Sequence, residues 1–295
     1  MASLSRTAWS RSSVMASALR SRSSYQRTVK NLRIDQDTRV MYQGFTGQAA
    51  TSNARETIDY GTNVVGGVSP GKGGCHHLGL PVFSTVAEAM DKIRPQVSAV
   101  FVPAQFAAKA IIESIEAQVP LVVSVAEHMP VHDLMRVHEA LACQDKTRLV
   151  GPNSPGIISP GRCRVGIMPF RQYRRGCVGI VSKSGTSMVD ALSIFFSDDA
   201  TEGIILIGEI GGDEELRAAE LIGVHGRTVA KPKPVIALVA GLTAPRGRTM
   251  GHAGAILTPR DATAGEKADA LRRAGAVVVA HPGDMGMRMK ELLGR

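Results

Sequence analysis

Short apolar segments alternate with longer segments of helical periodicity, and this alternation constrains the fold more than any other feature of the chain. Five runs in the first half are rich in Val and Ile and are bounded by Gly or Pro, as strands are. Three stretches between them carry apolar residues at helical spacing. This order predicts a parallel sheet with helices on both faces. The predicted strands are 39–45, 63–68, 99–103, 121–125 and 148–152, and the predicted helices are 85–93, 105–117 and 133–144.

The same alternation returns in the second half, after a segment rich in Gly, Pro and Arg. That segment, residues 156–176, has no clear period, which favours an interdomain connection. We therefore expect an α/β protein with two domains, residues 35–165 and 176–295, each built on a parallel sheet. The second domain is predicted to contain strands 177–182, 203–208, 235–241 and 276–280, and helices 214–222, 266–274 and 285–293.

The first 34 residues differ from the rest of the chain in charge. They hold seven of the 35 Lys and Arg residues and none of the 26 acidic residues, so the formal charge of +9 falls to +2 without them. An Arg- and Ser-rich leader without acids is typical of an organelle transit peptide, and a disordered basic tail is the alternative. The near-neutral remainder does not point to nucleic acid, and no apolar run approaches the length of a membrane span.

Glycine-rich and polar segments directly follow the predicted strands, at the sheet edge where α/β proteins bind ligands. In the first half these segments are residues 44–47 and 69–74. Glycine lets a backbone approach a phosphate closely, and a helix amino end supplies N–H groups. Lys72 adds a point charge. A tight turn and a solvated lysine explain each segment taken alone, whereas the two together favour an anionic ligand. The spacing is not GxGxxG, so a dinucleotide is not favoured.

Two loops of the second half carry groups suited to phosphoryl transfer. Ser182, Ser184 and Gly185 follow a strand and open a predicted helix, where a phosphate fits, although simple helix capping also accounts for them. His252 stands in a glycine-rich loop, and a neutral imidazole is a good nucleophile toward phosphorus. Glu209, which follows another strand, can hydrogen-bond one ring nitrogen and leave the other to attack. An ordinary loop histidine is the alternative.

No metal site is expected from the sequence. The four cysteines form no CxxC pair and give no zinc-ligand spacing. His76 and His77 are adjacent, and adjacent side chains point apart on most backbones, which makes them a poor ligand pair.

Several of these motifs occur together, and in order, in the α subunits of succinyl-CoA synthetases. They are residues 43–47 (QGFTG), 66–83, 208–212 (GEIGG) and 244–256. From about residue 35 to its end the chain resembles this family. The resemblance implies a CoA-binding Rossmann-like domain over residues 35–165 and a flavodoxin-like ligase domain over residues 176–295. With the leader 1–34, it implies a tricarboxylic acid cycle enzyme of the mitochondrial matrix or a related organelle.

The resemblance also implies a reaction and a set of residue roles. The family converts succinyl-CoA, nucleoside diphosphate and phosphate reversibly to succinate, CoA and nucleoside triphosphate. His252 would carry the phosphoryl group, Glu209 would position it, and Ser182, Ser184 and Gly185 would hold the phosphate. The resemblance places nucleotide and Mg²⁺ on a separate ATP-grasp β subunit, which would explain why the chain has no GxxxxGK[ST] motif. The residues implied to bind the substrate CoA are Thr46, Gly47, Gln48, Ala49, Lys72, Val125, Ala126 and Glu127.

One part of the family pattern is missing from this chain. After residues 182–186 the family continues with a helix, a strand, a Gly-Ile-Gly-Gly-Asp-Pro loop and a second helix, whereas residues 190–201 here already resemble that second helix. About thirty residues, the length of one βαβ unit, are absent. We expect a sheet that lacks one strand and exposes a ladder edge. A weakened paralogue that binds CoA and the β subunit without turnover, and a shortened product that folds poorly, are therefore alternatives to an active ligase.

Overall fold

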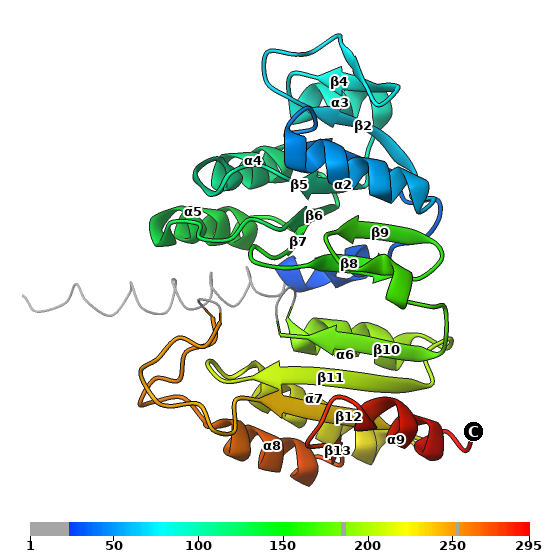
Figure 1. Cartoon of the computed structure of the whole chain (residues 1–295), viewed down its shortest axis with the longest axis vertical. Helices are drawn as coiled ribbons and strands as arrows, with labels where there is room; N and C mark the ends of the chain where they lie inside the picture. The colour runs from blue at the N-terminus through cyan, green and yellow to red at the C-terminus, as the bar shows by residue number, and fades with distance from the viewer. Residues whose placement is uncertain (1–23, 184–186, 252–253) are drawn as a thin grey trace, which may run out of the picture. The chain divides into compact units, whose positions relative to one another are not determined.

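The computed structural model describes residues 24–183, 187–251 and 254–295, and the chain divides into two compact units, residues 1–174 and 175–295 (Figure 1). Three of the predicted site residues, Ser184, Gly185 and His252, lie outside the described residues. No helix in the described ranges has the length and apolar character that crossing a bilayer requires.

The first unit is built on a seven-stranded sheet with the order β3-β4-β2-β1-β5-β6-β7. Its neighbouring strands are parallel except for the short antiparallel pair β3 and β4. The predicted α/β class with a largely parallel sheet is therefore confirmed. The strands are β1 (Val40–Gln43), β2 (Val64–Val68), β3 (His76–His77), β4 (Leu80–Phe83), β5 (Val97–Val100), β6 (Leu121–Ser124) and β7 (Arg148–Val150).

Helices cover both faces of this sheet. The helices are α2 (Gln48–Asp59), α3 (Val86–Ile93), α4 (Ala104–Glu116) and α5 (Val131–Ala142). On one face Ile111 of α4 and Val137 of α5 share an apolar core with Val122 of β6, and α3 extends that layer. On the other face α2 packs on Tyr42, whose hydroxyl bonds Asn53 and Thr57 of that helix at 2.8 and 2.9 Å.

Residues 156–166 form an ordered hairpin of the first unit rather than the expected irregular connection. The strands β8 (Gly156–Ser159) and β9 (Cys163–Gly166) are antiparallel. Arg164 of β9 has a nearly fully buried side chain that donates hydrogen bonds to Thr57 and Glu56 of α2. A buried arginine with these partners fastens the hairpin to α2, which the Gly- and Pro-rich composition did not reveal.

Residues ahead of the predicted domain start at residue 35 also pack on the first unit. A 3₁₀ helix spans Arg27–Leu32, and Thr28 and Leu32 are buried. The Asn31 side-chain amide donates to the Pro120 carbonyl at 2.9 Å and to the Lys146 carbonyl at 2.7 Å. In the described residues the folded part of this unit thus includes the segment from about Tyr25 onward.

The second unit has a parallel four-stranded sheet in chain order, β10-β11-β12-β13. Three helices, α6 to α8, share a core on one face, and α9 packs on the other. The elements are β10 (Val178–Ser182), α6 (Met188–Ser197), β11 (Gly203–Glu209), α7 (Glu214–Thr228), β12 (Val235–Ala240), α8 (Ala264–Arg273), β13 (Val277–Val278) and α9 (Asp284–Leu292).

The edge of this second sheet has the features expected from the missing strand and helix. In the described chain β10 pairs only with β11, so β10 is an edge strand. Ile180 of β10 is 51% exposed, although it lies in a row with the buried Ile205 of the neighbouring strand. The helix that follows β10 is α6, which overlaps residues 190–201 of the sequence prediction.

Candidate functional site at two sheet edges

The turn between β1 and α2 depends on glycines at two close approaches. Gly44 has φ +75°, and a Cβ there would lie 2.6 Å from the carbonyl oxygen of Phe101. Gly67 of β2 lies against the buried ring of Phe45, which any larger residue would overlap. Because the turn is this tight, α2 starts at Gln48, directly at the carboxyl edge of the sheet, with its first N–H groups at that edge.

A cluster of two hydroxyls and an ammonium occupies the same edge. The Thr46 backbone N–H and hydroxyl both donate to the Ser69 hydroxyl, each at 3.1 Å. The Lys72 ammonium donates to the Thr46 hydroxyl at 3.1 Å while its residue remains exposed. An ammonium has three donors, so this lysine can contact an anion as well as Thr46.

The structure brings some of the predicted first-unit residues together and leaves others further along the edge. Gly47 precedes α2, and Gln48 and Ala49 form its first turn, next to Thr46 and Lys72. Residues 125–127 follow β6, which is two strands away from β1 in the sheet. Ala126 is buried, and its carbonyl accepts the N–H of Asn153 at 2.9 Å.

Thr51 and His77 of this edge were not among the predicted CoA-binding residues, and neither was Ser69, although it opens the predicted segment 69–74. Ser69 is the acceptor that joins the two glycine-rich segments. The Thr51 hydroxyl lies 2.8 Å from His77 Nε2, and the His77 ring meets the Phe45 ring edge-on with centroids 5.0 Å apart. Among the described residues, no group of three or more His, Cys, Asp or Glu side chains is placed to hold a metal ion.

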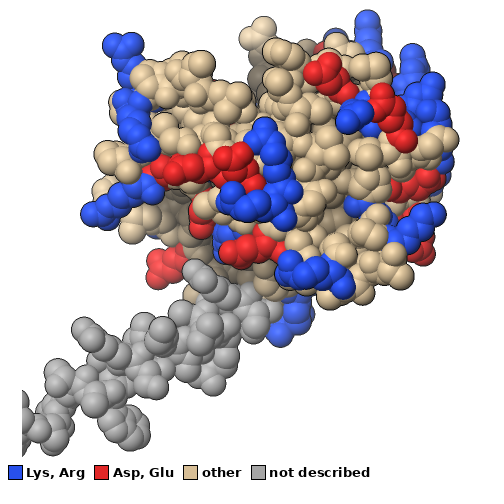
Figure 2. Space-filling view, turned by 90° about the horizontal axis from the view of Figure 1, so that it is seen from below, with Lys and Arg blue, Asp and Glu red and all other residues tan. Residues whose placement is uncertain are grey.

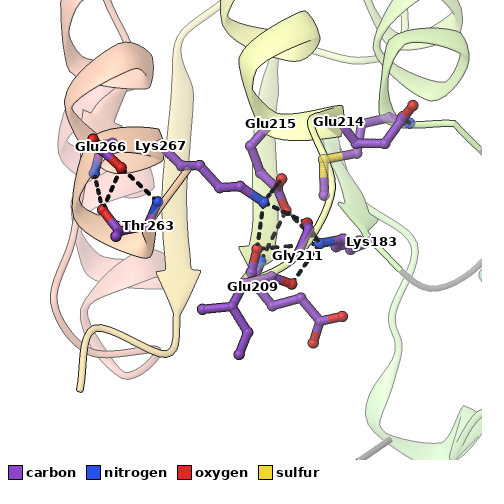
Figure 3. Close-up of polar contacts among 10 residues, drawn as sticks. Lys183, Glu209, Gly211, Glu214, Glu215, Thr263, Glu266 and Lys267 are labelled. Carbon is purple, nitrogen blue, oxygen red and sulfur yellow. Dashed lines mark hydrogen bonds and ion pairs between the residues drawn. The ribbon is translucent and has the colours of Figure 1, made fainter. Parts of the chain in front are cut away.

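In the second unit, a buried lysine binds the segment at the end of β11. Lys267 of α8 is fully buried. Its ammonium donates to the carbonyls of Glu209 and Gly211 at 2.9 and 2.7 Å and to the Glu215 carboxylate at 2.6 Å (Figure 3). Two of these partners are backbone groups of the GEIGG segment, so the lysine fixes the loop as well as pairing with an acid.

A second lysine reaches the same loop from β10. The Lys183 ammonium donates to the carbonyls of Ile210, at 2.7 Å, and Gly211, and it lies 3.7 Å from Glu215. Partial burial lowers the pKa of Lys183, and the nearby Glu215 carboxylate opposes that shift. The two lysines therefore approach the three successive carbonyls of residues 209–211 from opposite sides (Figure 3).

The backbone of Glu209 is fixed at both of its polar groups. Its carbonyl accepts from Lys267, and its N–H donates to Glu215 Oε1 at 3.0 Å. Glu215 is fully buried at the start of α7. Figure 3 shows the Glu209 side chain directed out of the cluster, away from Lys267 and Glu215. This arrangement presents one carboxylate at the sheet edge on a rigid loop.

The chain that follows residues 252–253 lies against this loop. The Met250 N–H donates to the Ala255 carbonyl at 2.8 Å, and Ala255 is buried in the same core as Ile210. Gly211 has φ +84°, and a Cβ there would lie 2.7 Å from the carbonyl oxygens of both Gly254 and Ile256. The segment that leaves His252 is therefore packed on the loop that carries Glu209.

The third predicted element, the start of α6, is only partly described. Ser182 pairs in register with Ile207, so it ends β10 at the edge where β11 continues to Glu209, and it is exposed. The first N–H of α6, that of Met188, donates to a Glu214 carboxylate oxygen at 2.9 Å. A protein carboxylate thus already occupies part of the helix entrance that the sequence suggested for phosphate.

The charges at this loop are paired. The ammonium groups of Lys183 and Lys267 lie beside the carboxylates of Glu215 and Glu209, so the formal charges of these four groups cancel. The surface drawn in Figure 2 likewise shows Lys and Arg beside Asp and Glu.

The close packing of the two loops predicts unequal effects for two neighbouring glycines. Both Gly211→Ala and Gly212→Ala place a side chain at positive φ, which costs about 1–2 kcal/mol. Only the first meets the carbonyls of Gly254 and Ile256, whereas nothing lies within 4 Å of the second. We expect chemical denaturation to show Gly211→Ala less stable by a further 1–3 kcal/mol or so. Equal losses would contradict the contact.

Each of the two units matches a known protein family. Residues 35–128 match the family model of the CoA binding domain, and residues 173–277 match that of the CoA-ligase domain. Among solved structures, an ATP citrate lyase of Methanosaeta concilii in complex with (3S)-citryl-CoA has a TM-score of 0.74 and 22% identity. That match covers 90% of this chain, which spans about half of the lyase chain, 51%, and shows the fold.

Closer relatives match over nearly their whole length. The α subunit of a succinate–CoA ligase from Aquifex aeolicus is 42% identical over 291 residues, covering 88% of this chain and 94% of the relative. A malate–CoA ligase α subunit from Methylorubrum extorquens is also 42% identical, over 89% of this chain and 98% of the relative. A Staphylococcus aureus succinate–CoA ligase α subunit is 40% identical, over 88% and 93%.

The first of these alignments also bears on the missing segment. It spans 291 positions but includes 88% of the 295 residues here, or about 260. Roughly thirty aligned positions thus have no counterpart in this chain, about one βαβ unit. The edge strand β10 is consistent with a loss from the second unit. With 42% identity and both domains matched in order, the chain belongs to the family of succinate–CoA ligase α subunits.

Proposed function

We propose that this chain is the α subunit of a succinate–CoA ligase and that His252 carries the phosphoryl group between its two half-reactions. The overall reaction interconverts succinyl-CoA, phosphate and nucleoside diphosphate with succinate, CoA and nucleoside triphosphate. The observation that carries the proposal is the packing of Gly211 on Gly254 and Ile256. It brings the loop of Glu209 to the chain that leaves His252.

In the proposed reaction, phosphate attacks the thioester carbonyl and releases CoA, which leaves succinyl phosphate. An imidazole nitrogen of His252 then attacks phosphorus and releases succinate. Glu209 accepts a hydrogen bond from the other ring nitrogen, which keeps the attacking nitrogen unprotonated. The phosphoryl group finally passes to a nucleoside diphosphate. Ser182, with Ser184 and Gly185 at the helix entrance, would hold the phosphoryl group while it waits.

For CoA, we propose the first-unit edge as the binding site. The supporting observations are the tight glycine turn before α2, the helix amino end at Gly47 to Ala49, and the ammonium of Lys72 beside Thr46. Such groups bind phosphate through N–H donors and positive charge. Val125, Ala126 and Glu127 would line the site further along the same edge.

The partner proposed for nucleotide and Mg²⁺ is a β subunit of the ATP-grasp type. Two of the relatives named above are described as ADP-forming succinate–CoA ligases, and a malate–CoA ligase is equally similar at 42% identity. The acid specificity is therefore to be measured with both succinate and malate. The alternative of a chain that binds CoA and the β subunit without turnover has no observation of its own in its favour.

Phosphorylation is tested with the purified chain, its β subunit and a nucleoside triphosphate labelled in the γ-phosphate. We expect an acid-labile label on the wild-type chain and none on His252→Asn, because the amide side chain lacks the nucleophilic ring nitrogen. CoA affinity of this variant should match that of the wild type. A wild-type chain that binds CoA and the β subunit but never gains the label would refute the proposed ligase activity.

CoA binding is tested at Lys72. We expect Lys72→Met to weaken CoA affinity about tenfold, near the loss of one hydrogen bond to a charged group, and Lys72→Arg to retain most of it. The wild-type affinity should also fall as salt rises, since ions screen the attraction. Isothermal titration calorimetry measures all three effects. Equal affinity of Lys72→Met and the wild type would remove Lys72 from the site.

We propose a mitochondrial matrix location, or that of a related organelle, from the leader alone, since the relatives named above are bacterial. A reporter fused after residues 1–34 should enter the organelle, and a version with the leader arginines changed to glutamine should not. Because residues 25–34 pack on the first unit, a cleavage point before Tyr25 would preserve these contacts. A reporter that stays in the cytosol would contradict the assignment.

A further inference from the structure

We propose that Glu215 and Lys267 are positioning residues for Glu209, and that their buried ion pair sets the loop that presents this carboxylate to the phosphorylated histidine. The inference rests on the proposed function for its catalytic consequence. Neither residue was identified as functional from the sequence. Lys267 lies on α8 and Glu215 on α7, and both side chains are fully buried.

Lys267 binds the loop of Glu209 as well as Glu215. An ammonium has three donors, and in Lys267 all three are used: one binds Glu215, and the others bind the carbonyls of Glu209 and Gly211. Two of its three donors thus bind backbone carbonyls of one loop. A lysine that only joined α8 to α7 would have no need of these carbonyls.

The contacts of Glu215 complete the support from the other side. One carboxylate oxygen binds Lys267 at 2.6 Å, and the other accepts the N–H of Glu209 at 3.0 Å. Gly208 makes room for this side chain, because a Cβ at that position would come within 2.6 Å of the Glu215 Cγ. The peptide groups on both sides of Glu209 are therefore held by one ion pair.

A gain in folding stability does not explain why such a buried ion pair is present. Removing two charges from water is costly, and replacing a buried ion pair with apolar side chains is often neutral or stabilising. Here a third charged group, Lys183, adds bonds to the carbonyls of Ile210 and Gly211. A cluster of this composition instead gives a loop one fixed geometry, which is what a hydrogen bond to a reacting imidazole requires.

The decisive variant is Glu215→Gln with Lys267→Met, which removes both buried charges together. We expect its melting temperature and CoA affinity to stay near those of the wild type. Its kcat in the full chain assembled with the β subunit should fall about 10²-fold, as small misplacements of reacting groups do, while KM for CoA is unchanged. Backbone amides of residues 210–212 should exchange hydrogen faster. Lys290→Met, on the exposed face of α9, is the matched control and should match the wild type throughout.

The kcat and the amide exchange of the double variant together decide whether the ion pair positions Glu209. Wild-type kcat and wild-type amide exchange in the double variant would leave the pair a purely structural link and overturn the inference. If the double variant does not fold, Glu215→Gln alone, which keeps the shape and an acceptor for the Glu209 N–H, takes its place, and wild-type kcat and exchange there would also overturn it. If the wild-type chain is never labelled at His252, the proposed function fails separately, and amide exchange alone judges the positioning of the loop.

Discussion

The second half of this molecule depends on a buried ammonium bound to backbone carbonyls. Lys267 bonds Glu215 and two carbonyls of the loop after β11, and Lys183 reaches the same loop from β10. Charges out of water are tolerated only when they are paired and hydrogen-bonded, and this cluster meets that condition by binding the loop itself. The backbone of the loop that carries Glu209 is therefore held by both lysines, and the chain that leaves His252 packs on it.

Both units place their candidate site residues by the same rule, at the carboxyl edge of a parallel sheet. In the first unit a glycine turn brings the start of α2 beside Thr46, Ser69 and Lys72. In the second, two strands end next to each other with Ser182 and Glu209. We propose that one edge binds the phosphates of a thioester substrate and that the other holds a single transferable phosphate. The shortened second sheet retains the strands that carry this edge.

Much of this could be predicted from sequence, because Val- and Ile-rich runs followed by glycine report directly on buried parallel strands. Gly44, Thr46 and Lys72 were predicted in this way as candidate site residues. Lys267 was not, because a lysine in the helical segment AGEKADALRR reads as solvated, and only the tertiary packing of α7 and α8 shows it buried. The hairpin at residues 156–166 was missed for a similar reason. The buried Arg164 joins it to α2, and hydrophobic periodicity does not indicate an ion pair between segments that are far apart in the sequence.

Glu209, held by the buried Lys267 and the partly buried Lys183, is proposed to hydrogen-bond the ring of a phosphorylated His252. A crystal structure of the phosphorylated full chain with its β subunit measures this directly, as the distance between the Glu209 carboxylate and the nearer ring nitrogen. We expect a separation of about 2.6–3.2 Å, within hydrogen-bond reach, with the Glu209 and Gly211 carbonyls still bound to Lys267. A histidine that carries phosphate while Glu209 points elsewhere, beyond reach of either nitrogen, would contradict it.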